Sequence, residues 1–305
     1  MTKFYFQRDI FINELMKSAK IDKDIYFISA DFGAPALDSF RDELPKQFIH
    51  SGISEQHMID LAAGMALSNK KVFVYAMSPF ISLRCIEQIK CSLAMMNLPV
   101  TILSIGGGLG YADAGPTHYS TEDIACLRSI ANIEVISPSD DQSTKDIVNL
   151  CLNIPKLRFV RLERAQLGNI YNNIVIKDNN SYSIINDKGN RCIISYGYML
   201  HRILKFIDEN NLHDQISVID LFKIKPIDQS LSLVLKKYEK IITYEEHCAD
   251  GGFGSAISEF ITDNKINTEL IRMHLPEKYF FQNGGRDFLL DKNNLSFDSI
   301  KSNIN

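Results

Sequence analysis

The most informative stretch of the sequence reads His50-Ser51-Gly52-Ile53-Ser54-Glu55-Gln56-His57, where a turn leads into a predicted helix. Downstream of it, apolar residues recur at helical spacing, and Asn69 ends the segment before a strand. Taken alone, the stretch indicates an ordinary helix N-terminus. The Ser54 hydroxyl would accept a hydrogen bond from a free backbone N–H group, and the Glu55 carboxylate would interact favourably with the positive end of the helix dipole.

Short β-rich runs alternate with longer amphipathic stretches on both sides of this helix, which is typical of strand and helix units around a parallel sheet. In the first half, the predicted strands cover residues 25–29, 72–75, 100–103, 134–136 and 158–161. In the second half, they cover residues 192–197, 216–220, 241–244 and 270–273.

A polar segment separates the two halves. Between residues 165 and 190 the chain is rich in Asn, Asp and Gly, which indicate turns rather than periodic structure. The sequence therefore predicts an α/β protein with two domains, at residues 1–175 and 176–305, each a mostly parallel sheet flanked by helices.

The composition restricts the class of protein. The 305-residue chain is long enough for two domains, each with its own core. Its hydrophobic content of 45% is near average, and no apolar run approaches the ~20 residues of a membrane-spanning helix. A net charge of -4 without a long basic run argues against nucleic acid as a partner. Residues 1–9 lack the apolar core of a secretory signal, so we expect a cytoplasmic protein with no membrane role.

The six cysteines are scattered, without a CxxC pair or a His/Cys cluster at zinc-site spacing. We therefore expect reduced, mostly buried thiols and no metal ligands in this chain. The cysteines are Cys85, Cys91, Cys126, Cys151, Cys192 and Cys248.

Further motifs follow the first one along the chain. They are Gly115-Pro116-Thr117-His118, Glu122-Asp123-Ile124-Ala125-Cys126-Leu127-Arg128, Ser137-Pro138-Ser139-Asp140 and Arg161-Leu162-Glu163-Arg164, then Phe222-Lys223-Ile224-Lys225-Pro226-Ile227-Asp228, Glu245-Glu246-His247 and Gly251-Gly252-Phe253-Gly254-Ser255. Together with Gly-Ile-Ser-Glu-Gln-His, their order and spacing resemble the transketolase family. Its relatives include deoxyxylulose-phosphate synthases and the beta subunits of 2-oxo acid dehydrogenases. The resemblance covers nearly the whole chain.

The resemblance implies a thiamine-diphosphate-binding fold, with a pyrimidine-binding domain followed by a transketolase C-terminal domain. The family's Mg²⁺ site, which holds the diphosphate, needs Gly-Asp-Gly and a later Asn as oxygen ligands, and this sequence contains no Gly-Asp-Gly. We interpret the nearest string, Ala249-Asp250-Gly251-Gly252, as a strand-to-helix turn. The expected partner is the N-terminal transketolase subunit, which would supply the Mg²⁺ ligands in an α2β2 heterotetramer.

Glu55 matches the family's catalytic glutamate, whose carboxylate hydrogen-bonds a ring nitrogen of the cofactor's aminopyrimidine in a dry site. The resemblance also implies that Asp31 lies near the cofactor and that an aromatic ring stacks on the pyrimidine. Phe80 is the first candidate for that ring and Tyr75 the second. An aromatic residue at a strand end is otherwise usually part of the core.

On the substrate side, His118 matches the histidine that contacts the donor's hydroxyl near the reacting carbon, so it is the second catalytic candidate. Asp113 would compensate for the family's aspartate, whose place is taken by Ala114. Arg164 matches an arginine that grips substrate phosphate. Its alternative is a surface ion pair with Glu163 or another acid.

The loop before the Gly-Pro-Thr-His motif carries further expectations. Gly106-Gly107-Gly108-Leu109-Gly110 misses the dinucleotide-binding spacing and predicts a flexible loop that lets backbone approach the cofactor. Ser120 and Asp123 look like a capping pair that anchors the loop. Pro35 and Ala36 stand where the family has a phosphate-binding serine, which predicts an unusual sugar or aldehyde as acceptor.

Three functions follow from these observations. The first is the C-terminal subunit of a split transketolase, which transfers a two-carbon ketol unit between sugars or sugar phosphates. The second is a related thiamine enzyme, either the beta subunit of a 2-oxo acid dehydrogenase or a deoxyxylulose-phosphate synthase. The third is a non-catalytic dimerisation scaffold. The Gly-Pro-Thr-His motif favours the first, and the presence of Glu55 with His118 argues against the third.

Overall fold

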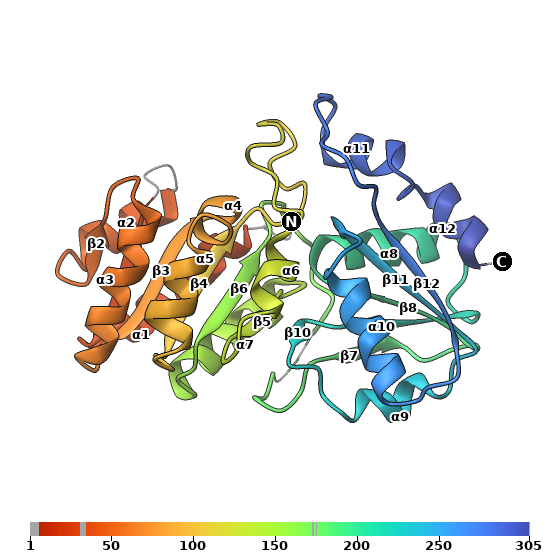
Figure 1. The fold of residues 1–305 in the computed structure, drawn as a ribbon, viewed down its shortest axis with the longest axis horizontal. Coiled ribbons are helices and arrows are strands. Elements are labelled where there is room, and N and C mark those ends of the chain that lie inside the picture. Colours follow the sequence, from red (N-terminus) through yellow and green to blue (C-terminus); the bar gives the residue numbers. More distant parts are fainter. Residues whose placement is uncertain (1–5, 31–34, 173, 175, 305) are drawn as a thin grey trace.

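The computed structural model describes residues 6–30, 35–172, 174 and 176–304. Within these ranges the chain forms two sheets, each flanked by helices (Figure 1). The first sheet has the strand order β10-β5-β6-β4-β3-β1-β2, and the second has the order β12-β11-β8-β9-β7. Neighbouring strands run parallel except β10 against β5 and β7 against β9. The predicted α/β class with two mostly parallel sheets is therefore confirmed.

The strands are β1 (Ile25–Ser29), β2 (Phe48–His50), β3 (Lys71–Met77), β4 (Val100–Ile105), β5 (Glu134–Ile136), β6 (Arg158–Leu162), β7 (Ser183–Asn186), β8 (Arg191–Ser195), β9 (Ile216–Asp220), β10 (Lys223–Lys225), β11 (Lys240–Cys248) and β12 (Glu269–Leu275). The helices are α1 (Gln7–Ile21), α2 (Pro35–Glu43), α3 (Glu55–Leu67), α4 (Ser78–Ile81), α5 (Ile86–Gln88), the π-helix η1 (Ile89–Ala94), α6 (Asp123–Arg128), α7 (Asp141–Asn153), α8 (Gly197–Asn210), α9 (Leu231–Leu235), α10 (Phe253–Asp263), α11 (Arg286–Lys292) and α12 (Phe297–Ile304).

Strand β3 shows how the first sheet is covered on both faces. Val72 and Val74 belong to the hydrophobic cluster that includes α3 and η1, whereas Phe73 and Tyr75 belong to the cluster that includes α1, α2 and α7. Successive side chains of a strand point to opposite faces, so a strand buried on both sides needs a continuous apolar run. This run is the signal that made β3 predictable.

Three short strands, β2, β7 and β10, were missed by the sequence analysis because they have three or four residues and little apolar alternation. Strand β10 also crosses between the two halves of the chain, since it pairs with β5 of the first sheet. Its Lys223 is buried and donates to the Asp178 carbonyl at 2.7 Å, while Lys225 donates to the Arg128 carbonyl at 2.9 Å. Ile224 of β10 also belongs to a hydrophobic cluster that contains residues of both halves.

The thiols are free, as expected, but only three of the six are buried. Cys85, Cys151 and Cys192 are buried, Cys126 and Cys248 are half-buried, and Cys91 is exposed on η1. Among the described residues, no helix combines the length and apolarity that crossing a bilayer demands.

Candidate active site

Most of the predicted site residues gather at one edge of the first sheet, where its parallel strands end. Phe80 follows β3 on α4, His118 lies in the loop after β4, and Arg164 follows β6. Glu55 is the first residue of α3, after β2. The carboxyl ends of parallel strands meet at one edge, which is where open α/β sheets bind ligands.

Glu55 is buried at this edge, with 4% of its surface exposed. Its Oε2 accepts a hydrogen bond from Nη1 of Arg84 at 2.6 Å, and 42% of the Arg84 side chain is exposed. The expected Ser54 cap is wrong, because the Ser54 hydroxyl donates back to the Ser51 carbonyl at 2.6 Å and makes no capping bond. Glu55 itself, in the first turn, is therefore the acidic group at the start of α3.

Arg84 also covers Phe80. The guanidinium carbon lies 4.4 Å from the centre of the Phe80 ring, so one side chain contacts both the predicted catalytic carboxylate and the predicted stacking ring. The sequence analysis missed Arg84. Arg84 lies in the turn between α4 and α5, outside the motifs quoted above, so no pattern in the sequence pointed to it.

His118 continues this line of contacts. Its ring meets the Phe80 ring edge-on, with centroids 5.3 Å apart and planes at 71°. Nδ1 of His118 shares a hydrogen bond of 2.9 Å with the Thr117 hydroxyl, and the Tyr111 ring lies 6.1 Å away on centroids. The imidazole therefore contacts two aromatic rings, and His118 as a whole is half-buried.

Arg164 and Asp113 end the line with an ion pair. Nη1 of Arg164 donates to Oδ1 of Asp113 at 2.6 Å, and the guanidinium carbon lies 4.4 Å over the Tyr111 ring. The pair is exposed, and the hydrogen bond from Arg164 lowers the pKa of Asp113. The acid paired with Arg164 is thus Asp113, because Glu163 is buried and pairs instead with Arg286.

Two predicted cofactor contacts do not join this line. Tyr75 is fully buried on the face of the sheet that packs against α1, away from α3, and its ring lies 6.1 Å from that of Phe27. Asp31 lies outside the described residues. The structure therefore brings Glu55, Phe80 and His118 together with the Asp113–Arg164 pair, linked by Arg84 and Tyr111.

Protein side chains fill the side of the glycine-rich segment on which Cβ atoms would lie, and the expected approach of its backbone to the cofactor stays a prediction. A Cβ on Gly106 would fall 2.2 Å from the Tyr111 ring, and one on Gly107 would fall 2.4 Å from the Arg161 guanidinium. A Cβ on Gly108 would fall 2.3 Å from the carboxyl carbon of Glu246. The glycines let these side chains pack against the main chain.

Ser120 and Asp123 do not form the expected capping pair. The Ser120 hydroxyl shares a 2.7 Å hydrogen bond with that of Ser78, and the Asp123 carboxylate accepts from Nε of Arg161 at 2.7 Å. Both Asp123 and Arg161 are buried, so their charges compensate each other inside the protein. This network anchors the loop through tertiary contacts instead of through a helix cap.

The string Ala249-Asp250-Gly251-Gly252 forms the turn between β11 and α10, as predicted. The Glu245 carboxylate accepts the backbone N–H groups of Phe253 and Gly254, the first residues of α10, at 2.8 and 2.6 Å. Burial raises the pKa of Glu245 to about 7. In the described part of the chain, no group of three or more His, Cys, Asp or Glu residues is arranged to hold a metal ion.

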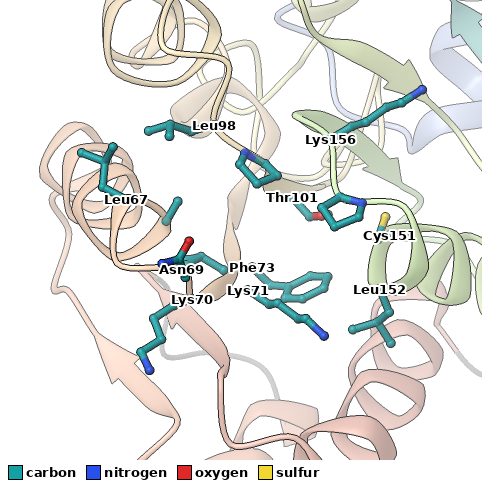
Figure 2. Close-up of a pocket in the computed structure, with 14 residues that line it drawn as sticks. Leu67, Asn69, Lys70, Lys71, Phe73, Leu98, Thr101, Cys151, Leu152 and Lys156 are labelled. Atoms are coloured by element: carbon teal, nitrogen blue, oxygen red, sulfur yellow. The ribbon is translucent and has the colours of Figure 1, made fainter.

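A cavity of about 420 Å³ lies at the opposite edge of the same sheet, by the amino ends of β3 and β4. Figure 2 shows Leu98, Phe73 and Leu152 around it, while Lys70 and Lys156 extend away. Both lysines form ion pairs elsewhere, Lys70 with Asp24 and Lys156 with Asp178 and Glu134. This cavity is separate from the line of predicted site residues.

The fold defines an α/β protein with two mostly parallel sheets, and comparison with known proteins identifies the family. The sequence matches the transketolase pyrimidine binding domain over residues 7–169 and the transketolase C-terminal domain over residues 182–295. The chain therefore belongs to the transketolase family, as the motifs predicted, and this family uses thiamine diphosphate.

Individual relatives agree with this assignment. The chain is 33% identical to a subunit of the apulose-4-phosphate transketolase of Phocaeicola vulgatus, covering 87% of this chain and 86% of that protein. It is 30% identical to a putative transketolase C-terminal section of Methanocaldococcus jannaschii, covering 95% and 92%. It is also 30% identical to the 1-deoxy-D-xylulose-5-phosphate synthase of Fusobacterium nucleatum, but covers only 49% of that protein. The comparisons thus favour a transketolase subunit over the synthase alternative.

A solved structure supports the fold. A split gene transketolase, described as an inactive beta4 tetramer, superimposes with a TM-score of 0.86 over 99% of this chain and 97% of that chain. At 22% sequence identity the match establishes the shared fold alone.

Proposed function

We propose that this chain is the C-terminal subunit of a split transketolase that transfers a two-carbon ketol unit between sugars or sugar phosphates, with thiamine diphosphate and Mg²⁺ as cofactors. The observation that carries the proposal is the continuous line from the buried Glu55 through Phe80 and His118 to the Asp113–Arg164 pair. It begins with groups suited to a heteroaromatic ring and ends with groups suited to a polyhydroxylated or phosphorylated substrate.

The residues at the first end fit an aminopyrimidine. Glu55 offers a carboxylate that is almost completely shielded from water, where it can share a proton with a ring nitrogen. Phe80 offers the face of an aromatic ring for stacking. When bound, thiamine diphosphate supplies the carbon nucleophile that accepts the ketol unit. The protein's part is to hold Glu55 and Phe80 in fixed relation to that ring.

In this structure the Arg84 guanidinium contacts both Glu55 and the Phe80 ring. A ring stacked on Phe80 and hydrogen-bonded to Glu55 needs the space that the guanidinium takes up. Cofactor binding therefore requires Arg84 to swing outward, which its 42% exposed side chain permits. Its charge then meets solvent or the partner chain.

His118 and Arg164 serve the substrate. His118 lies next to Phe80, so it can hydrogen-bond a substrate hydroxyl close to the pyrimidine side of the site. Arg164 lies one aromatic ring further out, where its guanidinium can exchange Asp113 for a phosphate or hydroxyl group. Both residues therefore set the substrate's orientation.

The second half of the cofactor site is proposed to come from another chain. Relatives of similar extent are named as one subunit, or as the C-terminal section, of a transketolase. The residues found here suit the pyrimidine ring, while Mg²⁺ and the diphosphate need a set of oxygen ligands. We place those ligands on an N-terminal transketolase subunit, in an α2β2 heterotetramer of the cytoplasm.

Reconstitution tests the proposal. The chain is mixed with the subunit that carries Gly-Asp-Gly, thiamine diphosphate and Mg²⁺, and ketol transfer is measured from xylulose phosphate to ribose phosphate. The mixture should be active and each chain alone inactive. Glu55→Gln should lose at least ~100-fold in turnover. Glu87→Gln, on the exposed surface of α5, is the matched control. Full activity without the partner, or near wild-type turnover in Glu55→Gln, refutes the proposal.

A further inference from the structure

The loop that carries His118 is closed at its base by paired backbone hydrogen bonds. The Gly108 N–H donates to the Ser120 carbonyl at 3.0 Å, and the Ser120 N–H donates to the Gly108 carbonyl at 2.8 Å. Residues 109–119, here named the His118 loop, extend from this base past the edge of the first sheet (Figure 1). Tyr111 and Asp113 lie in the same loop.

Strand β11 of the second sheet reaches the base of the His118 loop. Oε2 of Glu246 accepts the Leu109 N–H at 3.1 Å. The carboxyl group also fills the space beside Gly108, whose positive φ of 59° and lack of a side chain allow this approach. A group from the second domain therefore contacts the main chain at the point where the loop begins.

Arg286, the first residue of α11, holds Glu246 in place. Its Nε donates to Oε2 of Glu246 at 2.8 Å, and its Nη2 donates to Oε1 of Glu246 and, at 2.7 Å, to Oε2 of Glu163. The guanidinium carbon lies 3.9 Å over the Tyr198 ring. Since Glu163 directly precedes Arg164, this single guanidinium connects the base of the His118 loop with the strand end that carries Arg164.

Glu163, Glu246 and Arg286 form a triad that fixes the direction of its side chains more than it stabilises the fold. Glu163 and Glu246 are 1% exposed and the Arg286 side chain 10%, so desolvation offsets most of their attraction. Paired hydrogen bonds from a planar guanidinium, however, define the direction of each carboxylate closely. The three residues thus fix two site-bearing segments relative to each other.

We propose that Glu246 and Arg286 are positioning residues, through which the second domain sets the His118 loop and Arg164 for substrate binding. The inference rests on the proposed function for its kinetic part. It gives the C-terminal domain a part in substrate recognition through contacts behind the site, since neither residue belongs to the line from Glu55 to Arg164.

The test uses the full chain in complex with its partner subunit, thiamine diphosphate and Mg²⁺. Glu246→Gln keeps an oxygen for the Leu109 N–H but removes the charge, and Arg286→Lys keeps the charge but removes the paired donors. Asp291→Asn is the control, because it breaks an ion pair between α11 and Arg202 without touching the loop. Both test variants should lose roughly 10- to 100-fold in kcat/KM for sugar transfer, with the Kd of thiamine diphosphate unchanged.

A second measurement separates this inference from the proposed function. Hydrogen exchange of residues 109–119 should become faster in Glu246→Gln and Arg286→Lys, but not in Asp291→Asn, whether or not the complex transfers ketol units. A wild-type complex without ketol transfer would overturn the proposed function alone. Unchanged exchange in both test variants, or a kcat/KM no lower than that of Asp291→Asn, overturns the positioning role.

Discussion

Replacing Arg84 by methionine should make the complex bind thiamine diphosphate more tightly. The guanidinium pairs with Glu55 at 2.6 Å and lies 4.4 Å over Phe80, so a cofactor ring bound to these two residues, as proposed, would have to break both contacts. Methionine keeps an unbranched apolar side chain, but it is shorter than arginine and carries no charge. Without the Arg84 guanidinium, the buried Glu55 carboxyl lacks this partner in the free complex. A hydrogen bond to the ring nitrogen of the cofactor then satisfies it, which increases the affinity for thiamine diphosphate.

The magnitude follows from the two contacts. An ion pair with an exposed member contributes at most about 1 kcal/mol, and a cation over an aromatic ring contributes about 0.5 to 1 kcal/mol at an exposed site. Together they amount to roughly 1 to 2 kcal/mol, which corresponds to about 5- to 30-fold in the dissociation constant.

Calorimetric titration of thiamine diphosphate into the Mg²⁺-containing complex measures this change. Loss of a positive charge also weakens long-range attraction of an anionic cofactor, so Lys90→Met is the matched control, on the exposed side of η1. If Arg84→Met binds the cofactor no more tightly than Lys90→Met, Arg84 stays in the loaded site and the displacement reasoning is wrong.

Two further predictions concern the substrate side and the effect of pH. His118→Ala and Arg164→Gln should each raise KM for the sugar by roughly 10-fold in steady-state assays while the Kd of the cofactor stays constant, and a parallel loss of cofactor affinity would contradict their placement. Burial raises the pKa of Asp220 from 3.8 to about 7, so in the native state this carboxyl costs stability as pH rises through that interval. The free energy of unfolding of Asp220→Asn, measured with urea relative to that of wild type, should rise by up to ~4 kcal/mol from pH 4 to pH 8. If the difference between variant and wild type is equal at both pH values, the raised pKa of Asp220 is not its cause.

The fold could be predicted where strands are buried on both faces. Strands β1, β5 and β9 have the predicted bounds, because an apolar run flanked by turn residues defines a strand in a parallel sheet without any knowledge of its neighbours. The edge strand β10 carries Lys-Ile-Lys and could not be found in this way. Its stability depends on β5 and on the Asp178 carbonyl, which are distant in the sequence.

The candidate site was predictable to the extent that motifs carry it. Glu55, Phe80 and His118 lie in or beside recognisable motifs, and the structure brings them together because their strands end at one edge. The sequence alone thus determined the family and the α/β class with two mostly parallel sheets, while the roles of Glu55, Phe80 and His118 stay predictions.

Only the tertiary structure decided how those residues are held. Arg84 lies over Phe80, and the second-domain residues Glu246 and Arg286 lie behind the His118 loop, and none of them belongs to a pattern with a period along the chain. Charged side chains pair with whichever partner the packed backbone brings within about 3 Å. That partner is set by the meeting of distant strand ends and loops, and a local sequence pattern does not contain this information.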